Sequence, residues 1–203
     1  LMLTGDTPSL FTDPNDHATT LLFGDAGTAT ALELSGDAAP GYYSLHTDGS
    51  RYDGLILRGG GYRNRFPADP RDLCLSMDGA GVFAFTIERV PSLVLGSLEF
   101  AGLSASDIHQ YFFHQSNQFM MRHLIKKCGI AEDRVPIVLD RYGNAGGASV
   151  ALAITEGMQR PAGDVRGMMV GYGVGLSWGS AIVTIDRNAT LMHADYSGDI
   201  PRA

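Results

Sequence analysis

The chain has 203 residues, of which 44% are hydrophobic and 18% are charged, a composition typical of a globular protein with a sizeable core. Its 15 basic and 22 acidic residues give a formal net charge of −7, which argues against non-specific nucleic-acid binding because that needs a basic surface. No apolar run approaches the roughly 20 residues that cross a bilayer, so we expect neither nucleic acid nor a membrane as a partner.

The first 35 residues have the pattern of a sheet. Residues 20–23 and 28–34 predict two strands joined by a tight turn at 24–27, where glycines allow positive φ. Residues 36–40 follow as a linker rich in small residues. We place a domain boundary there.

The middle of the chain predicts short strands and one long helix. Residues 42–57 contain strand-like pieces broken by a turn at 48–50, a glycine-rich loop covers 59–70, and residues 73–77 predict another strand. Apolar residues from 82 to 98 recur at helical spacing and predict an amphipathic helix. Pro91 lies inside it and predicts a kink or a break, because proline lacks a backbone donor.

Strands and helices alternate through the remainder. Residues 111–113 predict a buried strand that runs directly into His114, and a helix from about 117 to 128 ends at a glycine. A strand is expected at 136–139, a helix through 157, and two final strands at 168–172 and 180–185. This alternation predicts an α/β fold with a central sheet.

Polar or glycine-rich residues follow strands or begin helices at three places: His114 with its neighbours, the segment around Asn144, and the glycine turn at 171–175. Strand ends in α/β sheets are where ligand sites lie, so the three places predict one converging site. Each alone also has a structural interpretation, as a buried histidine, a turn asparagine or a tight turn.

The two cysteines, Cys74 and Cys128, have neither a zinc-ligand spacing nor a pairing pattern. Reduced thiols in a cytoplasmic protein are the simpler interpretation. Ser177 lies in a Gly-x-Ser-x-Gly pattern, but a predicted strand follows it instead of the helix that a hydrolase nucleophile elbow needs. We therefore interpret Ser177 as a turn residue, and we expect no metal and no redox cofactor.

Five ordered motifs resemble the ketoacyl-ACP synthase III-type condensing enzymes of the thiolase superfamily. His-Gln-Ser-Asn at 114–117 is similar to the family's His-Gln-Ala-Asn, and Asp-Arg-Tyr-Gly-Asn at 140–144, with Ala-Ser at 148–149, is similar to a second family motif. Tyr-Gly-Val-Gly at 172–175, with Trp-Gly-Ser-Ala at 178–181, is similar to the family's closing motif. Phe-Gly-Asp-Ala-Gly at 23–27 and Met-Asp-Gly at 77–79 also follow the family's order.

The resemblance runs from residue 1 to about residue 186 and implies a thiolase-like fold, with a mixed central sheet and helices on both faces. Residues 1–35 would end the N-terminal thiolase-like half, and residues 40–186 would form the C-terminal half. Residues 187–203 are a tail of unknown role. Apolar strands at the start of the chain would be left exposed, so we expect an upstream segment or a complementary chain to cover them.

The resemblance also implies a set of site residues. His114 and Asn144 match the catalytic pair that hydrogen-bonds the thioester carbonyl of malonyl-ACP during decarboxylation. Val174 matches the residue whose backbone N–H contributes to the oxyanion hole. Three further residues match substrate-binding positions: Asn117 near the pantetheine arm, Tyr172 where the family usually has Phe, and Phe83.

The chain departs from the family at three points. Neither Cys74 nor Cys128 matches the nucleophilic cysteine. Phe119 stands where many members have an arginine that docks the carrier protein, and His17 stands where many have an arginine that contacts the coenzyme A nucleotide. The expected partners are nonetheless acyl carrier protein, acyl-CoA and a second copy in a homodimer of the complete enzyme, with no cofactor.

Our first hypothesis is therefore an acyltransferase that performs a decarboxylative Claisen condensation of an acyl thioester with malonyl-ACP, in fatty acid or related biosynthesis. This chain would supply the histidine and the asparagine but not the cysteine, so we expect the chain alone to be inactive as an acyltransferase. Two alternatives stay open. The chain could be a non-catalytic partner subunit or fragment of such an enzyme, or it could be a relative that transfers acyl groups without decarboxylation.

Overall fold

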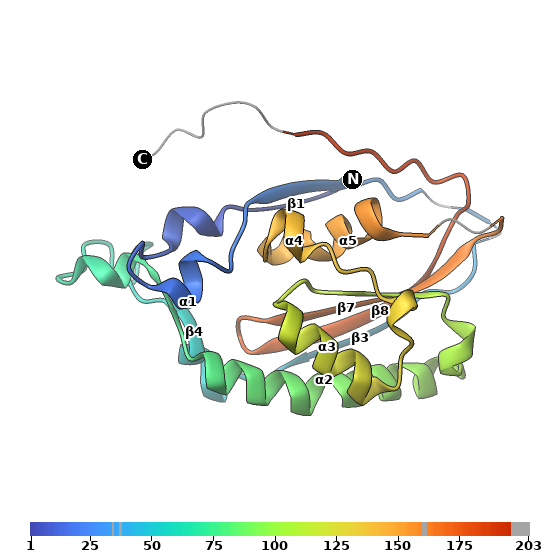
Figure 1. Ribbon diagram of the computed structural model, residues 1–203, viewed down its shortest axis with the longest axis horizontal. Coiled ribbons are helices and arrows are strands. Elements are labelled where there is room, and N and C mark those ends of the chain that lie inside the picture. The colour runs from blue at the N-terminus through green and yellow to red at the C-terminus, as the bar shows by residue number, and fades with distance from the viewer. Residues whose placement is uncertain (34, 37, 160–161, 196–203) are drawn as a thin grey trace.

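The computed structural model describes residues 1–33, 35–36, 38–159 and 162–195. Its centre is a four-stranded mixed sheet in the order β3-β8-β7-β6 (Figure 1). The strands are β3 (Tyr42–Thr47), β8 (Ser177–Ile185), β7 (Val165–Gly173) and β6 (Gln110–Phe113). β6 runs parallel to β7, and the other two neighbouring pairs are antiparallel. The predicted central sheet is therefore confirmed.

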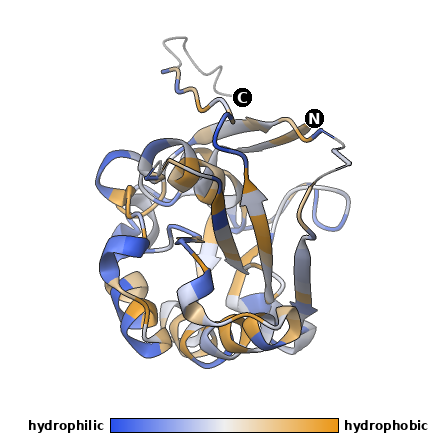
Figure 2. Cartoon of the chain, turned by 90° about the vertical axis from the view of Figure 1, so that its right-hand side faces the viewer, coloured by the Kyte–Doolittle hydropathy of each residue, from blue (hydrophilic) through white to orange (hydrophobic). Residues whose placement is uncertain are grey.

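Buried apolar side chains explain the position of β6. All four of its residues are buried, and Tyr111, Phe112 and Phe113 are at most 1% exposed. A short strand whose residues are all buried is typical of parallel pairing with both faces covered. Figure 2 shows hydrophobic segments, in orange, on long strands inside the molecule. The end of β6, where His114 follows, is consequently held inside the fold.

One face of the sheet is covered by α2 (Gly79–Ala101) and α3 (Gln118–Cys128) (Figure 1). Of the kink or break predicted at Pro91, the break is wrong, because α2 continues through this residue without interruption. Pro91 removes one backbone hydrogen bond, but it is buried beside Val90 and Val94, whose packing offsets that loss. By length and composition α2 could span a membrane, yet its buried side packs on the sheet as in a core helix.

The other face carries α4 (Leu139–Tyr142) and α5 (Ser149–Gly157), and the two-stranded sheet of β1 (Met2–Asp6) and β2 (Ala26–Thr30) lies beyond these helices (Figure 1). Helices therefore lie on both faces, as the resemblance implied. A third sheet pairs β4 (Leu55–Leu57) with β5 (Leu75–Met77). Short 3₁₀ turns lie at Pro8–Phe11, Gly49–Gly54, Pro70–Leu73, Ala105–Asp107, Glu132–Arg134 and Gly146–Ala148.

The predicted hairpin of residues 20–23 and 28–34 is wrong. Residue 20 ends helix α1 (His17–Thr20), and β2 pairs with β1 rather than with residues 20–23. Asp16 begins this helix, because its carboxylate accepts the backbone N–H of Ala18 and the hydroxyl of Thr19. Residue 34 of the predicted strand and residue 37 of the predicted linker lie outside the described residues.

The strand predicted at 136–139 is also wrong, because α4 begins at Leu139 and the three preceding residues belong to no strand. The buried side chain of Gln115 takes the place of a neighbouring strand. Its Oε1 accepts the backbone N–H of Val138 at 2.9 Å, and its Nε2 donates to the Pro136 carbonyl at 3.3 Å. The backbone polar groups are thus satisfied without a β-ladder.

The remaining predicted elements are confirmed with shifted ends. α3 begins after Asn117, whose side chain accepts the Met120 N–H, and it ends at Gly129, which has a φ of 66°. Each of the two last strands begins three residues earlier than predicted, β7 also ends one residue later, and together they form a long hairpin. Ser177 begins β8, so no helix follows the Gly-x-Ser-x-Gly pattern.

The segment after α1 is tied to the loop that carries Asn144. The Asn144 N–H donates to the Leu22 carbonyl at 2.9 Å, and the Gly24 N–H donates to the Asn144 carbonyl at 3.0 Å. Phe23 and Asn144 form an isolated parallel bridge. A β-carbon at Gly24 would clash with the carbonyl oxygen of Tyr142. Gly24 is therefore required for this close approach of two backbones.

We expect Gly24→Ala to lower the free energy of unfolding by about 2 kcal/mol, the typical cost of forcing an atom into filled space. Gly27→Ala is the matched control, because a β-carbon there meets no atom within 4 Å. Urea unfolding followed by circular dichroism measures both variants. Equal stability of the two alanine variants would contradict the proposed backbone contact.

Candidate active site

His114 lies at the point where the two parallel strands end. It directly follows β6, and its backbone N–H donates to the Val170 carbonyl of β7 at 2.7 Å, which extends the β6–β7 pairing by one step. Tyr172 lies two residues further along β7. Its ring stands edge-on to the His114 imidazole, with centroids 5.2 Å apart and an interplanar angle of 84°. The sheet therefore determines where the imidazole lies.

Ser149 holds one nitrogen of that imidazole. Its Oγ lies 2.6 Å from His114 Nδ1 and also accepts the backbone N–H of Gln115 at 3.4 Å. A Ser149 hydroxyl that donates to Nδ1 selects the neutral tautomer whose proton is on Nε2. This tautomer makes Nε2 a hydrogen-bond donor.

Burial keeps the ring uncharged. Loss of solvation lowers the pKa of His114 from 6.5 to about 4, against a smaller opposing contribution from a backbone hydrogen bond with Gly146. The imidazole is consequently neutral at pH 7. A neutral ring with its proton on Nε2 can donate one hydrogen bond without first losing a proton.

Asn144 is 6% exposed and lies after Gly143, whose φ of 62° turns the chain out of α4. The side-chain oxygen of Asn144 accepts the Gly146 N–H at 3.1 Å. With Oδ1 engaged, the remaining hydrogen-bonding groups of the carboxamide are the two N–H groups of Nδ2. Gly146 contacts both Asn144 and His114. The two predicted catalytic residues therefore meet at one shared neighbour.

Tyr172 and Ser116 add a buried pair of hydroxyl groups beside His114. The two oxygens are 2.9 Å apart, and Tyr172 also donates to the His114 carbonyl at 3.3 Å. Burial raises the pKa of Tyr172, so its hydroxyl stays protonated. Tyr172 thus lies against His114, and its contact with substrate stays a prediction.

The other predicted residues have different surroundings. Val174 is 64% exposed in the turn between β7 and β8. The Asn117 oxygen accepts the Met120 N–H at 2.8 Å, so this side chain begins α3. Phe83 stacks on Phe119 with centroids 5.7 Å apart. Contacts with substrate at all three positions stay predictions.

Three residues near the site had no role assigned from the sequence: Ser149, Ser116 and Gln115. All three lie within the motifs, but only the folded chain brings the Ser149 hydroxyl to a histidine 35 residues earlier. The start of the tail also has a position. His193 lies 3.3 Å from a carboxylate oxygen of Glu156 on α5, whose other oxygen accepts from the Tyr142 hydroxyl at 2.9 Å. Residues 196–203 of the tail lie outside the described residues.

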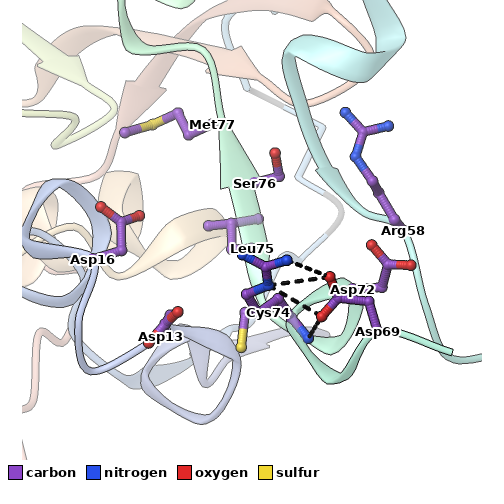
Figure 3. Close-up of a pocket in the computed structure, with 10 residues that line it drawn as sticks. Asp13, Asp16, Arg58, Asp69, Asp72, Cys74, Leu75, Ser76 and Met77 are labelled. Atoms are coloured by element: carbon purple, nitrogen blue, oxygen red, sulfur yellow. Dashed lines mark hydrogen bonds and ion pairs between the residues drawn. The ribbon is translucent and has the colours of Figure 1, made fainter. Parts of the chain in front are cut away.

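Neither cysteine has the surroundings of an activated nucleophile. Burial raises the pKa of Cys128 to about 11, which suppresses the thiolate. Cys74 borders a separate surface pocket of about 380 Å³ between β5 and the loop before α1 (Figure 3).

That pocket is lined mainly by charged residues, and several of these already have local partners. Asp69 binds Arg71 at 2.6 Å, Asp13 accepts from Asn15, and Asp16 begins α1. The pocket contains none of the predicted site residues. Within residues 1–33, 35–36, 38–159 and 162–195, no group of three or more His, Cys, Asp or Glu side chains could hold a metal ion.

Comparison with known proteins bears on the class. Residues 1–49 match the family model 3-Oxoacyl-[acyl-carrier-protein (ACP)] synthase III, and residues 98–185 match 3-Oxoacyl-[acyl-carrier-protein (ACP)] synthase III C terminal. The beta-ketoacyl-[acyl-carrier-protein] synthase III of Streptococcus sanguinis is 33% identical over 190 residues, covering 91% of this chain and 59% of the relative.

Solved structures agree. The crystal structure of a 3-oxoacyl-(acyl-carrier protein) synthase from Burkholderia xenovorans is 41% identical with a TM-score of 0.84, covering 91% of this chain and 55% of that one. The synthase III from Thermus thermophilus is 28% identical with a TM-score of 0.77, covering 89% of this chain and 57% of that one.

Mixed sheet, covering helices and matched motifs together define a thiolase-like fold of the condensing-enzyme class. The chain belongs to the ketoacyl-ACP synthase III-type family of the thiolase superfamily. It spans 59% of the length of the Streptococcus relative and 55% of the Burkholderia chain.

The depressed pKa of His114 predicts a pH dependence of stability. A histidine with a folded pKa of about 4 and an ordinary value of 6.5 stabilises the fold fully above pH 6.5, and this contribution is lost as the pH falls towards 4. We expect a loss of up to about 3 kcal/mol between pH 7.5 and pH 4.

Urea unfolding of the wild type and of His114→Gln across this pH range isolates the contribution, because all other carboxylates and histidines titrate in both proteins. The stability difference between the two should change with pH in the stated direction. A difference that is constant from pH 7.5 to pH 4 would show that His114 is not buried as a neutral ring.

Proposed function

We propose that this chain provides the decarboxylation half of a beta-ketoacyl-[acyl-carrier-protein] synthase III-type active site. The observation that carries the proposal is the pair of oriented donors. Ser149 holds His114 Nδ1 at 2.6 Å and Gly146 holds Asn144 Oδ1 at 3.1 Å, so Nε2–H and Nδ2–H remain to bind a substrate oxygen. An oxygen that accepts both bonds is stabilised when it becomes negative.

The reaction that fits two such donors is the decarboxylation of a malonyl thioester. The bond between the α-carbon and the carboxylate breaks, carbon dioxide leaves, and the electron pair forms an enolate whose oxygen binds His114 and Asn144. The enolate carbon then attacks an acyl group held as a thioester on a cysteine, and the new carbon–carbon bond displaces the cysteine thiolate. Neither donor needs to change its charge during these steps.

The nucleophilic cysteine of this scheme comes from outside the present chain. The raised pKa of Cys128 and the position of Cys74 at a different pocket both support this assignment. Apolar side chains exposed on β1 and β3, among them Leu3 at 71% and Leu45 at 82%, support a further polypeptide segment that covers them. We infer that the complete enzyme is a homodimer.

Further contacts of the proposed enzyme follow from the family positions. The backbone N–H of Val174 would contribute to the oxyanion hole of acyl transfer, and Asn117, Tyr172 and Phe83 would line the path of the pantetheine arm and acyl chain. The substrates are acyl-CoA and malonyl-ACP, with acyl carrier protein as the protein partner. The proposed reaction uses no metal and no redox cofactor, and it involves neither nucleic acid nor a membrane. We propose that the enzyme acts in the cytoplasm, in fatty acid or related biosynthesis.

One observation favours a second candidate. Phe119, at the position of a carrier-docking arginine, is 73% exposed and stacks on Phe83. An apolar group in this position favours the alternative of an acyl transferase relative with a different acceptor. The hydrogen bonds that hold His114 and Asn144 leave two oriented donors. A purely structural subunit does not need such donors, so this arrangement favours a decarboxylating enzyme.

Decarboxylation can be measured without the nucleophile. We expect the protein to release labelled carbon dioxide from malonyl-ACP or malonyl-CoA, and we expect His114→Ala and Asn144→Ala each to lower the rate about 100-fold, the typical effect of removing one oxyanion donor. His46→Ala is the matched control, because this histidine is exposed on β3 and stacks on Trp178. Release at an unchanged rate in His114→Ala would contradict the proposal.

The second half of the scheme has its own measurement. After incubation with an acyl-CoA, intact-mass analysis should show that neither Cys74 nor Cys128 gains the acyl group. A second polypeptide segment that carries the family cysteine should gain it. Acylation of Cys74 or Cys128 at a rate that supports turnover would overturn the assignment of the nucleophile to another segment.

A further inference from the structure

The hydroxyl groups of Ser116 and Tyr172 depend on each other. Their oxygens are 2.9 Å apart, and the residues are 7% and 8% exposed, so water cannot readily replace either partner. Apart from Tyr172, the Ser116 oxygen has the sulfur of Met120 at 3.4 Å, which is a weak acceptor. A buried hydroxyl without a good partner is costly. Each of the two hydroxyl groups therefore needs the other as its hydrogen-bond partner.

The pair is attached to the backbone of His114. Tyr172 donates to the His114 carbonyl at 3.3 Å, and that carbonyl also accepts the Ser116 N–H at 2.9 Å. If the Tyr172 hydrogen is directed to the carbonyl, the Ser116 hydroxyl must supply the hydrogen between the two oxygens. The result is a chain of hydrogen bonds from Ser116 through Tyr172 to His114.

The same tyrosine ring fixes the imidazole from the side. Its edge-on contact at 5.2 Å and the Ser149 bond at 2.6 Å approach the His114 ring from two different elements, β7 and α5. Movement of Tyr172 would therefore shift both the carbonyl and the ring plane of His114. Replacing Ser116 by alanine and Tyr172 by phenylalanine would keep the contact of the aromatic ring with the His114 imidazole. It would remove the hydrogen bond between the two hydroxyl groups and the one from Tyr172 to the His114 carbonyl.

We propose that Ser116 and Tyr172 act as one positioning unit that sets the backbone and ring orientation of His114. Both hydroxyl groups are engaged within the protein, so they act through His114, whether or not the Tyr172 ring also contacts the acyl chain. The activity readout of this inference rests on the proposed decarboxylation, but a structural readout of the imidazole does not.

The test is a double-mutant cycle of Tyr172→Phe, Ser116→Ala and the double variant. Each single variant should lower the kcat of malonyl-thioester decarboxylation about tenfold with little change in KM, because the donor is misplaced rather than removed. The double variant should also lose about tenfold, since a unit is broken only once. A hundredfold loss in the double variant would show two independent effects and would overturn the inference.

Two matched controls separate positioning from general loss of buried hydrogen bonds. Tyr111→Phe removes a buried hydroxyl that donates to the Ala105 carbonyl at 3.2 Å, and Ser97→Ala removes one that lies 2.6 Å from the Ser180 hydroxyl. Both lower stability without touching His114, so kcat should stay at the wild-type value. A tenfold loss of kcat in the controls as well would show that the pair contributes only ordinary packing and would overturn the inference.

The imidazole itself gives an independent readout. The protein has six histidines, and the nitrogen resonances of His114 are identified as those that disappear in His114→Gln. We expect the wild-type ring to have its proton on Nε2, and we expect exchange-broadened or mixed tautomer signals in Tyr172→Phe and Ser116→Ala. Unchanged His114 signals in both variants would overturn the positioning role. A protein without decarboxylation but with these shifts would refute the proposed function alone.

Discussion

The site depends above all on the parallel pairing of β6 with β7. This pairing brings the ends of two strands to the same edge of the sheet, and the hydrogen bond from the His114 N–H to the Val170 carbonyl extends it by one residue. The buried aromatic residues of β6 hold that edge inside the protein. A shift of one residue in this register would turn the side chain of His114 to the other face.

Asn144 is positioned by an unrelated set of contacts. Its backbone is held by Leu22 and Gly24 from the beginning of the chain, and its side-chain oxygen by Gly146 from its own loop. Gly24 matters because only a residue without a β-carbon allows this approach to Tyr142. The two donors thus belong to different layers of the fold. Their common neighbour, the glycine-rich turn before α5, is the place where the layers meet.

Electrostatics and geometry agree on the state of His114. Burial disfavours the imidazolium, and a Ser149 hydroxyl that donates to Nδ1 selects the tautomer with its proton on Nε2. A charged imidazolium would also attract an enolate, but it would carry a large desolvation cost in a buried site. A neutral donor is the less costly arrangement, and it needs no reorganisation during the reaction. Surrounding hydroxyl groups from α5, β7 and the His114 turn supply the necessary orientation.

The sequence by itself determined the class of the fold, the long helices, the buried strand before His114 and the ordered motifs. These follow from local periodicity, from caps such as Asn117 and Gly129, and from residue types at fixed spacing. It failed at residues 20–23 and 136–139, because strand propensity does not reveal that Asp16 begins a helix or that the Gln115 side chain replaces a neighbouring strand. Tertiary structure alone decided these segments, the tautomer of His114, and the pairing of Ser116 with Tyr172 across 56 residues of sequence. The reason is physical. A hydrogen bond between residues that are far apart in the sequence depends on which backbone segments approach each other. The packing of the sheet and its two helical layers sets that approach.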